Sequence, residues 1–209
     1  MPNPFKELVF RLLTPKKRFE RIYAHNRWSS EESVSGQGSE LTATDALRAA
    51  LIPLFDELQI KRVLDAPCGD FNWMQHVLEL APISYVGVDI VQDLIDRNND
   101  IYGSKSVRFI HGDILTGPLP EADLIISRDC FIHLSFRDTA RALKQFKASG
   151  SRYLLTNSYP GVSRNEDIVT GRWRFINLAL PPYNYPPPQR KISETEPGKQ
   201  MWLWELAQL

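Results

Sequence analysis

The sequence predicts an α/β protein with a doubly wound, mostly parallel sheet that ends in a C-terminal antiparallel hairpin. From Arg62 onward, short apolar runs alternate with longer segments whose apolar residues recur at helical spacing, which is typical of βαβ units. Prolines and glycines punctuate the connections. After Ser158 the alternation stops, and two short runs joined through Pro197-Gly198 predict the hairpin.

Each expected element follows from its own run of residues. The apolar runs are short enough for strands, and the segments between them are long enough for crossover helices. The expected strands are Val63–Asp65, Tyr85–Ile90, Val107–His111, Asp123–Ser127 and Tyr153–Thr156; the expected helices are Phe71–Leu80, Val91–Asn99 and Phe136–Ala148; the expected hairpin strands are Lys191–Glu194 and Met201–Leu206.

The N-terminal part of the chain is expected to be a basic amphipathic segment, residues 1–30, ahead of a main domain over residues 31–209. Apolar residues between Phe5 and Leu13 recur at helical spacing, and a basic cluster follows. Such a segment can touch a membrane surface peripherally or pack on its own domain with its basic side in water. A further helix is expected after residue 40, capped by Thr42 or Thr44.

The composition limits the classes of partner and location. With 209 residues and 43% hydrophobic content, the chain can bury a core of its own. Its net charge is zero, so it lacks the broad attraction that most nucleic-acid binders use, and we expect no nucleic-acid partner. Cys68 and Cys130 form no paired framework, which favours the cytoplasm. No apolar stretch approaches the ~20 residues of a transmembrane segment.

Acidic residues stand at the ends of three successive expected strands. Asp65 begins the turn Ala66-Pro67-Cys68-Gly69-Asp70, Asp89 ends the second strand, and Asp113 follows the third. Ligands of open α/β sheets bind outside the carboxyl ends of the strands, where a turn of small residues lets a cofactor approach the backbone. An acid after the second strand can accept both hydrogen bonds of a ribose diol. Any one of these acids alone could be an ordinary turn or cap residue.

With Asp65 and Gly69 in this turn, the sequence resembles the class I S-adenosylmethionine-dependent methyltransferases, whose Rossmann-like sheet carries an acid and alternating glycines there. Pro67 and Phe71 stand where glycines are usual, although proline at the first position is familiar among relatives. The resemblance covers about residues 63–158. It implies S-adenosyl-L-methionine as cofactor and S-adenosyl-L-homocysteine as product. The implied cofactor contacts are Asp65, Pro67, Gly69, Asp89 at the ribose, Ile90, Asp113 at the adenine amino group, Ile114 on its face, and Arg128.

The fourth strand runs into Arg128-Asp129-Cys130-Phe131-Ile132-His133-Leu134, which resembles the segment under the methionine moiety in small-molecule methyltransferases. It is not an Asn-Pro-Pro-Tyr type motif, so methylation of nucleobases is disfavoured. Asp129 and His133 are the candidate catalytic residues. His133, with a pKa naturally near neutrality, is either a general base for a hydroxyl acceptor or a residue that caps or anchors the next helix. The spacing of His111, His133 and the cysteines predicts no metal site.

Both flanks of the core carry further candidates. Trp28 and the glycine-serine stretch at residues 33–39 resemble a segment that closes over the methionine end in some bacterial methyltransferases. This implies cofactor contacts from Trp28, Gly38, Ser39 and Thr42; a flexible linker is the alternative. In the long insertion after Ser158, Arg172, Tyr183 and Tyr185 either shape an acceptor pocket or belong to a proline-rich cover over the sheet.

The expected activity is methyl transfer to a hydroxyl or carboxyl of a small molecule or saccharide. Methyl transfer needs no covalent nucleophile, so Cys68 is expected to be a packing residue. The alternative from another class is a non-catalytic methyltransferase-fold protein that binds the cofactor or a partner. A nicotinamide-dependent dehydrogenase is disfavoured, because Asp65 to Asp70 lacks the three-glycine pyrophosphate turn and places an acid where phosphates would bind.

Overall fold

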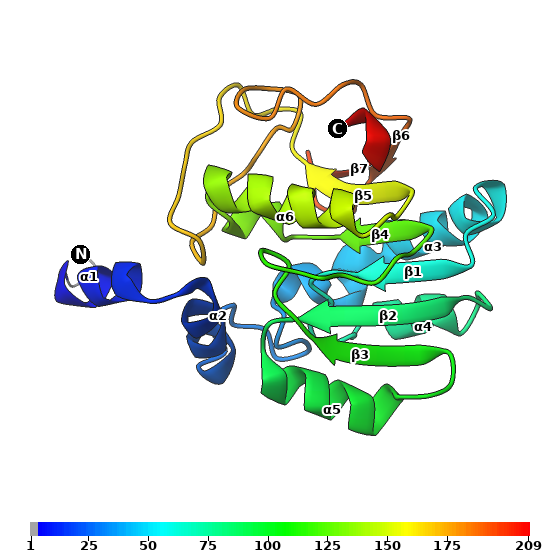
Figure 1. The fold of residues 1–209 in the computed structure, drawn as a ribbon, viewed down its shortest axis with the longest axis horizontal. Helices are drawn as coiled ribbons and strands as arrows, with labels where there is room; N and C mark the ends of the chain where they lie inside the picture. Colours follow the sequence, from blue (N-terminus) through cyan, green and yellow to red (C-terminus); the bar gives the residue numbers. More distant parts are fainter. Residues whose placement is uncertain (1–3) are drawn as a thin grey trace.

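A seven-stranded sheet forms the centre of the computed structural model, which describes residues 4–209 (Figure 1). The strand order is β3-β2-β1-β4-β5-β7-β6. The first five strands are parallel, whereas β7 runs antiparallel to both β5 and β6, as the sequence predicts. The strands are β1 (Arg62–Asp65), β2 (Ser84–Asp89), β3 (Val107–His111), β4 (Leu124–Ser127), β5 (Tyr153–Ser158), β6 (Arg190–Ser193) and β7 (Gln200–Glu205).

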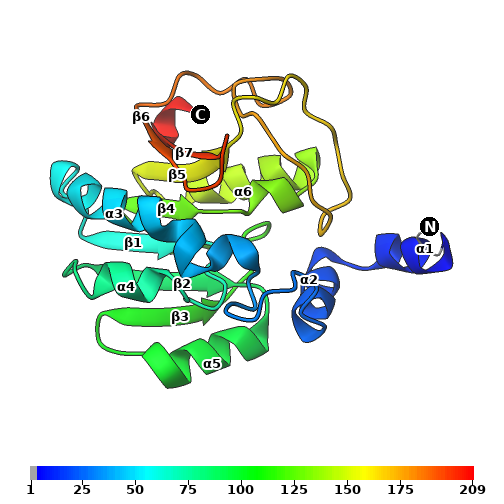
Figure 2. The same cartoon turned by 180° about the vertical axis from the view of Figure 1, so that it is seen from behind.

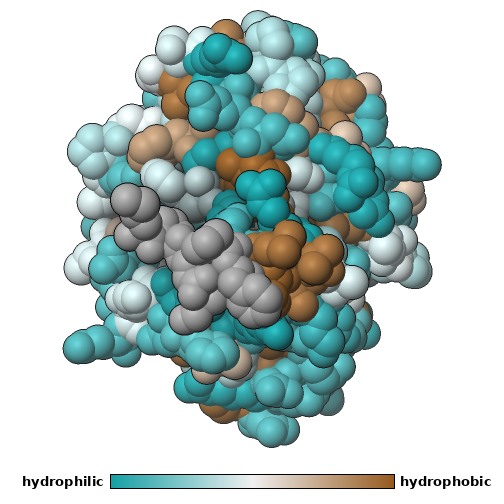
Figure 3. Space-filling view, turned by 90° about the vertical axis from the view of Figure 1, so that its left-hand side faces the viewer, coloured by the Kyte–Doolittle hydropathy of each residue, from teal (hydrophilic) through white to brown (hydrophobic). Residues whose placement is uncertain are grey.

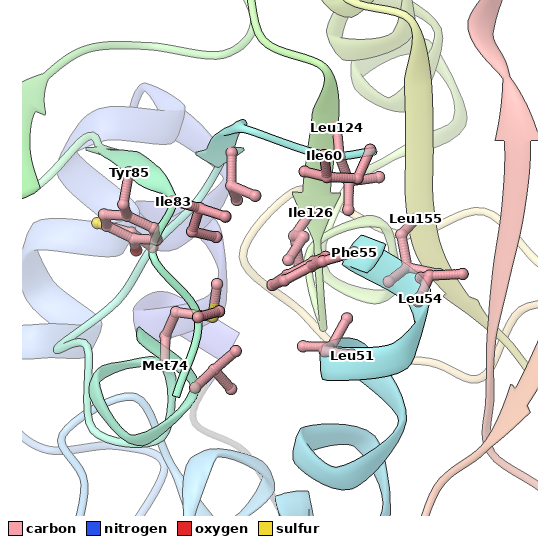
Figure 4. Packing of buried hydrophobic residues seen from close by; sticks show 14 of the residues in the cluster. Leu51, Leu54, Phe55, Ile60, Met74, Ile83, Tyr85, Leu124, Ile126 and Leu155 are labelled. Atoms are coloured by element: carbon pink, nitrogen blue, oxygen red, sulfur yellow. The ribbon is translucent and has the colours of Figure 1, made fainter. Parts of the chain in front are cut away.

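Helices cover both faces of the sheet, so the doubly wound arrangement is confirmed (Figures 1 and 2). Alternate residues of one strand point to opposite faces: Val63 packs in the cluster with α3 and α4, and Leu64 packs in the cluster with α6. On the first face, α3 places Leu51 and Phe55 against β4 and β5 (Figure 4). The helices are α3 (Leu41–Glu57), α4 (Met74–Leu78), α5 (Gln92–Tyr102) and α6 (Phe136–Ala148).

The N-terminal arm consists of two helices, α1 (Pro4–Leu12) and α2 (Pro15–Ala24). Thr14 separates them: its Oγ1 accepts a hydrogen bond from the Lys17 amide at 3.3 Å, and Pro15 occupies the first turn of α2, where proline is favoured. In Figure 1, α1 lies at one end of the molecule and α2 lies between α1 and the strands. Within residues 4–209, no helix has both the length and the apolar character that crossing a bilayer requires.

The start of α3 corrects one expectation, because neither Thr42 nor Thr44 caps that helix. The N-cap is Glu40, whose side chain makes no capping hydrogen bond. Thr44 lies inside the first turn, and its Oγ1 donates to the Glu40 carbonyl at 3.0 Å. Thr44 follows the first three residues of the helix, so its hydroxyl bonds back to the preceding turn and lies beyond the amides that an N-cap side chain accepts from.

The turn after β1 delays the next helix, which begins at Met74 and not at Phe71. Gly69 and Phe71 both adopt left-handed backbone conformations, with φ of 57° and 62°. Glycine takes this conformation at little cost, but a residue with a Cβ atom is strained there. The Phe71 ring is buried among three other rings, with centroids at 4.9 Å from Tyr85, 5.0 Å from Phe109 and 5.1 Å from Tyr102. Ring packing therefore holds Phe71 in a backbone conformation that favours glycine.

Candidate active site

A cavity that opens to solvent, with about 760 Å³ of empty space, lies at the carboxyl ends of the parallel strands, and a second with about 520 Å³ adjoins it. The strand ends contribute Pro67, Gly69, Asp89 and Asp129 to both. Ile90, Asp113 and Ile114 line the larger cavity, whereas Asp65 and Arg128 line the smaller one. The structure thus brings together every predicted cofactor residue of the core.

Asp89 is fixed in place by backbone amides. Its two carboxylate oxygens accept hydrogen bonds from the Gly69 amide at 3.2 Å and the Val91 amide at 3.0 Å. Burial raises the pKa of this carboxyl, and the amide hydrogen bonds oppose that rise. Because each carboxylate oxygen can accept more than one hydrogen bond, Asp89 keeps acceptor capacity toward the cavity while it ties the turn after β1 to the end of β2.

Asp65 and Asp113 lie in different environments. Asp65 is buried and accepts a hydrogen bond from the Tyr85 hydroxyl at 2.9 Å; burial raises its pKa to about 7. Asp113 is less buried, and its Oδ1 accepts from the Leu115 amide at 2.8 Å, which caps the turn after β3. Asp113 therefore stabilises the turn after β3 and also lines the larger cavity.

Residues 30–40 form a segment that covers the turn after β1, which we call the capping segment. The Asp70 carboxylate accepts from the Ser33 hydroxyl at 2.8 Å and the Val34 amide at 2.9 Å, and Ser35 Oγ accepts from the Asp70 amide at 2.9 Å. Asn72 donates to Glu32 at 2.7 Å. These hydrogen bonds fix the capping segment on the core, in contrast to a flexible linker.

The capping segment and its flanks hold the N-terminal candidates. Trp28 and Ser35 line both cavities, and Ser39 lines the smaller one. Gly38 lies so close to Asp129 that a Cβ atom at this position would come within 2.8 Å of Oδ2. Thr42, on the first turn of α3, lines neither cavity.

Four charged side chains meet beside the smaller cavity. The Arg128 guanidinium donates to Glu194 at 3.1 Å and pairs with Asp129 at 3.0 Å. The Lys199 ammonium contacts Asp129 at 2.7 Å and Glu194 at 3.5 Å. Glu194 and Lys199 were not predicted as site residues. They come from the C-terminal hairpin: Lys199 directly follows its Pro197-Gly198 turn, and Glu194 ends the expected strand before that turn.

Asp129 occupies the most constrained position in this cluster. Its φ is 50°, and its amide donates to Asn157 Oδ1 at 2.9 Å. Burial raises the pKa of its carboxyl, but Arg128 and Lys199 outweigh that effect and hold the pKa below its ordinary value. One oxygen, Oδ1, is buried and has no hydrogen-bond partner among residues 4–209. A buried carboxylate oxygen of this kind can accept from a cationic or hydroxyl donor in the cavity.

His133 lines both cavities and has a fixed orientation. Its Nδ1 lies 2.9 Å from the Arg172 carbonyl oxygen, which can only accept, so Nδ1 carries the proton and Nε2 holds the free lone pair of the neutral ring. The Trp28 ring packs on it with centroids 5.3 Å apart, and burial lowers its pKa. The cap of α6 is Ser135, whose Oγ accepts from the Asp138 amide at 3.2 Å, so His133 is not the cap.

The three candidates from the long insertion line neither cavity. Arg172 pairs with Glu7 and lies 4.4 Å above the Phe10 ring. Tyr183 accepts from Arg174 at 2.8 Å, and Tyr185 packs edge-on against a core tryptophan. These contacts are those of a cover over the sheet.

Apolar residues outside the predicted set complete the larger cavity. Pro15, Phe19 and Tyr23 come from α2, and Leu115 and Leu134 come from the core. Phe19 and Tyr23 are four residues apart and therefore share one face of α2. That spacing was visible in the sequence, but which side of the helix met the sheet was not.

Among the described residues, the two cysteines and the histidines form no second reactive or metal-binding site. Cys68 and Cys130 are free and buried, and burial raises the pKa of both thiols. This is the behaviour of packing residues and not of reactive thiols. Gly87 has no room for a side chain beside Cys68, whose Sγ would lie 2.9 Å from a Cβ atom there. Within the described residues, no group of histidine, cysteine and acidic side chains has the arrangement of a metal site.

The strand order and a cavity above the β1 turn define a Rossmann-like methyltransferase fold. Comparison with known families agrees: residues 63–149 match the family model described as a methyltransferase domain. Residues 63–149 are thus similar to a methyltransferase domain, and the sheet has the Rossmann-like fold of S-adenosylmethionine-dependent methyltransferases. Among curated proteins, uncharacterised methyltransferases of Mycobacterium tuberculosis and Mycobacterium bovis are 27% identical over 164 residues, which cover 69% of this chain and 77% of theirs.

Two solved structures show the same fold at low identity. Human N-acetylserotonin methyltransferase, in complex with S-adenosylmethionine, aligns with a TM-score of 0.65 at 14% identity and covers 91% of this chain; the chain spans 59% of that protein. Magnesium protoporphyrin IX methyltransferase from Synechocystis, also with bound cofactor, aligns with a TM-score of 0.60 at 11% identity and covers 92% of this chain and 97% of that protein.

Proposed function

We propose that this chain methylates a hydroxyl group of a small molecule with an apolar body, with His133 as the general base. One observation carries the proposal: the hydrogen bond from His133 Nδ1 to the Arg172 carbonyl leaves Nε2 as the basic atom of a neutral ring in the cavity wall. The lowered pKa keeps that ring neutral at pH 7.

The residues at the strand ends fit S-adenosylmethionine. Asp89 retains acceptor capacity for the ribose hydroxyls, and Asp113 with Ile114 would hold adenine. The unpartnered Oδ1 of Asp129 suits the ammonium of the methionine part. When bound, the cofactor supplies a methyl group already activated on a sulfonium, so the chain has to orient the acceptor, exclude water and remove a proton.

The apolar wall of the larger cavity supports the acceptor class. Phe19, Tyr23 and Leu115 would cover an aromatic or aliphatic body, with Trp28 and His133 at the polar end. A bare saccharide would leave most of its hydroxyls unpaired against such a wall, which is costly. A carboxylic acid would enter the same cavity already deprotonated and would not need His133.

This difference in the need for a base defines the experiment. Matched pairs of apolar alcohols or phenols and the corresponding carboxylic acids are offered to the wild type and to His133→Gln. We expect transfer to the hydroxyl acceptor to fall by roughly 10²–10⁴-fold in the variant, as for loss of a general base. Calorimetric titration with S-adenosylhomocysteine checks that cofactor binding is retained. Equal rates in both proteins would refute His133 as the base, and preference for the acids would assign a carboxyl acceptor.

The pH dependence gives a second test of the same role. The base is active only when neutral, and its pKa lies below the ordinary value of about 6.5. The rate of methyl transfer should therefore be flat around pH 7 and decline only on acidification below that value. The acid limb should vanish from the residual activity of His133→Gln. A limb that persists unchanged in the variant belongs to another group.

A further inference from the structure

Exposed apolar side chains gather at the N-terminal end of the molecule. Among the described residues whose burial is known, Leu8 and Leu12 of α1 are 55% and 78% exposed, and Trp173 and Phe175 of the long insertion are 53% and 43% exposed. Elsewhere in residues 7–209, the other large apolar side chains that are comparably exposed are Leu80, Ile101 and Ile110, which lie on different elements. Figure 3 looks onto this end and shows a hydrophobic patch with hydrophilic residues beside it.

Specific contacts hold α1 and the insertion together as one surface. The buried Arg18 guanidinium donates to the carbonyls of Phe10 at 2.9 Å, Arg11 at 2.8 Å and Thr170 at 3.1 Å. Gly171 approaches so closely that a Cβ atom there would lie 3.0 Å from the Phe10 ring. The apolar residues on both segments therefore keep a fixed arrangement, unlike those on a loose tail.

The charge of this end differs from that of the whole chain. Residues 4–27 contain seven lysines and arginines and two glutamates, whereas the complete chain has 25 basic and 25 acidic residues. Residues 4–27 thus carry an excess of five positive charges, and the rest of the chain carries an excess of five negative charges. Arg11 and Lys17 have side chains 63% and 64% exposed, and Arg21 and Arg27 are also exposed.

We propose that this end of the molecule, formed by α1 with its basic flank and residues 173–175, docks on an anionic phospholipid bilayer. Leucines and a tryptophan within a basic surround are the composition of interfacial membrane contacts, where the apolar groups enter the headgroup boundary and the cations meet anionic lipids. A second copy of this chain fits less well, because a symmetric contact would bring two positively charged arms together. The proposal is independent of the acceptor.

The full-length protein is tested by co-sedimentation with vesicles of phosphatidylcholine alone and of phosphatidylcholine mixed with phosphatidylglycerol. We expect binding to the anionic vesicles only, weakened by salt. The double variant Leu8→Ser/Leu12→Ser should bind at least about ten-fold less, since each buried leucine contributes strongly to partitioning. The matched control is Leu80→Ser/Ile101→Ser, at positions 73% and 56% exposed on other elements, which should bind like the wild type.

The charge contribution has its own pair of variants. Arg21→Gln/Arg27→Gln should lose on the order of five-fold in affinity per residue. Arg137→Gln, with a side chain 83% exposed on α6, should lose little. Retained affinity for S-adenosylhomocysteine shows that each variant is folded. The proposal is overturned if neutral and anionic vesicles bind equally, if the control and arm variants lose binding alike, or if the leucine pair instead mediates a dimer that sedimentation velocity detects.

Discussion

Phe71 allows a sharp test of the reasoning about the turn after β1. The two substitutions Phe71→Ala and Phe71→Gly remove the same buried ring and differ only in one Cβ atom. At ordinary positions alanine is the more stable of the two, by roughly 0.5–1 kcal/mol. At Phe71 the order should reverse, because φ is 62° and a Cβ atom is disfavoured in that conformation.

The magnitude follows from two opposing contributions. Loss of a ring with three aromatic neighbours at 4.9–5.1 Å should cost about 3–5 kcal/mol in either variant. Relief of the left-handed strain returns about 1–2 kcal/mol to glycine alone. The greater freedom of glycine in the unfolded chain offsets roughly 0.5–1 kcal/mol of that gain. We therefore expect Phe71→Gly to be more stable than Phe71→Ala by about 1 kcal/mol.

Urea unfolding followed by circular dichroism measures this difference, provided that the slope of the transition is the same for both proteins. Phe109 supplies the matched control. Its ring belongs to the same aromatic group, but its backbone lies in β3, so Phe109→Ala should be more stable than Phe109→Gly. If Phe71→Ala is instead more stable than Phe71→Gly, the backbone at position 71 is not strained by a Cβ atom. The argument that ring packing offsets such strain is then refuted.

Three further predictions concern buried charges. Lys199→Met should destabilise the protein by about 3–5 kcal/mol in urea unfolding, because Asp129 loses a partner in a buried cluster. Asp89→Asn should weaken S-adenosylhomocysteine binding by roughly 10–100-fold in calorimetric titration, as the ribose loses a charged acceptor. Asp65 has a folded pKa near 7, above its unfolded value, so the folded state binds the extra proton and stability declines as pH rises from about 4 to 7. In Asp65→Asn that decline should be smaller.

Matched control variants distinguish these specific effects from a nonspecific loss of stability or of cofactor affinity. Lys144→Met changes an exposed residue on α6 and should cost less than about 0.5 kcal/mol, whereas Lys191 is unsuitable because its ammonium lies 5.0 Å from the Trp202 ring centroid. Asp93→Asn, on the exposed side of α5, should leave the cofactor affinity unchanged. Equal effects at positions 199 and 144, equal affinities for Asp89→Asn and the wild type, or identical pH slopes with and without Asp65 would each contradict the corresponding argument.

The local part of the fold was predictable from the sequence. The bounds of β3 and α6 agree with the predicted ranges, and the other core strands differ by one or two residues. The visible apolar runs predict that Asp65, Asp89 and Asp113 lie at the carboxyl edge of the sheet: the first two end β1 and β2, and Asp113 lies two residues beyond β3. The start of α4 was missed because the left-handed conformation of Phe71 depends on its aromatic neighbours, which are distant in sequence.

The rest of the site depends on tertiary contacts. Glu194 and Lys199 reach Arg128 and Asp129 only because β7 pairs with β5, which carries the hairpin back to the end of β4. No local pattern encodes that partnership. Arg172 was expected either to shape an acceptor pocket or to belong to a proline-rich cover, and the contacts of its guanidinium with Glu7 and the Phe10 ring favour the cover. Its contribution to the site is its backbone carbonyl, a group that every residue possesses.

The site is assembled from both ends of the chain around a shared middle. Residues 63–149, which carry the family match, contain the strand-end acids, whereas α2, the capping segment and the C-terminal hairpin lie outside that range. The parts of the site outside residues 63–149 can therefore differ between two proteins that both match the methyltransferase domain. Two relatives that agree well across the middle need not share a substrate. Under the proposed function, the residues at the positions of Phe19 and Tyr23 would distinguish relatives by acceptor more directly than overall identity does.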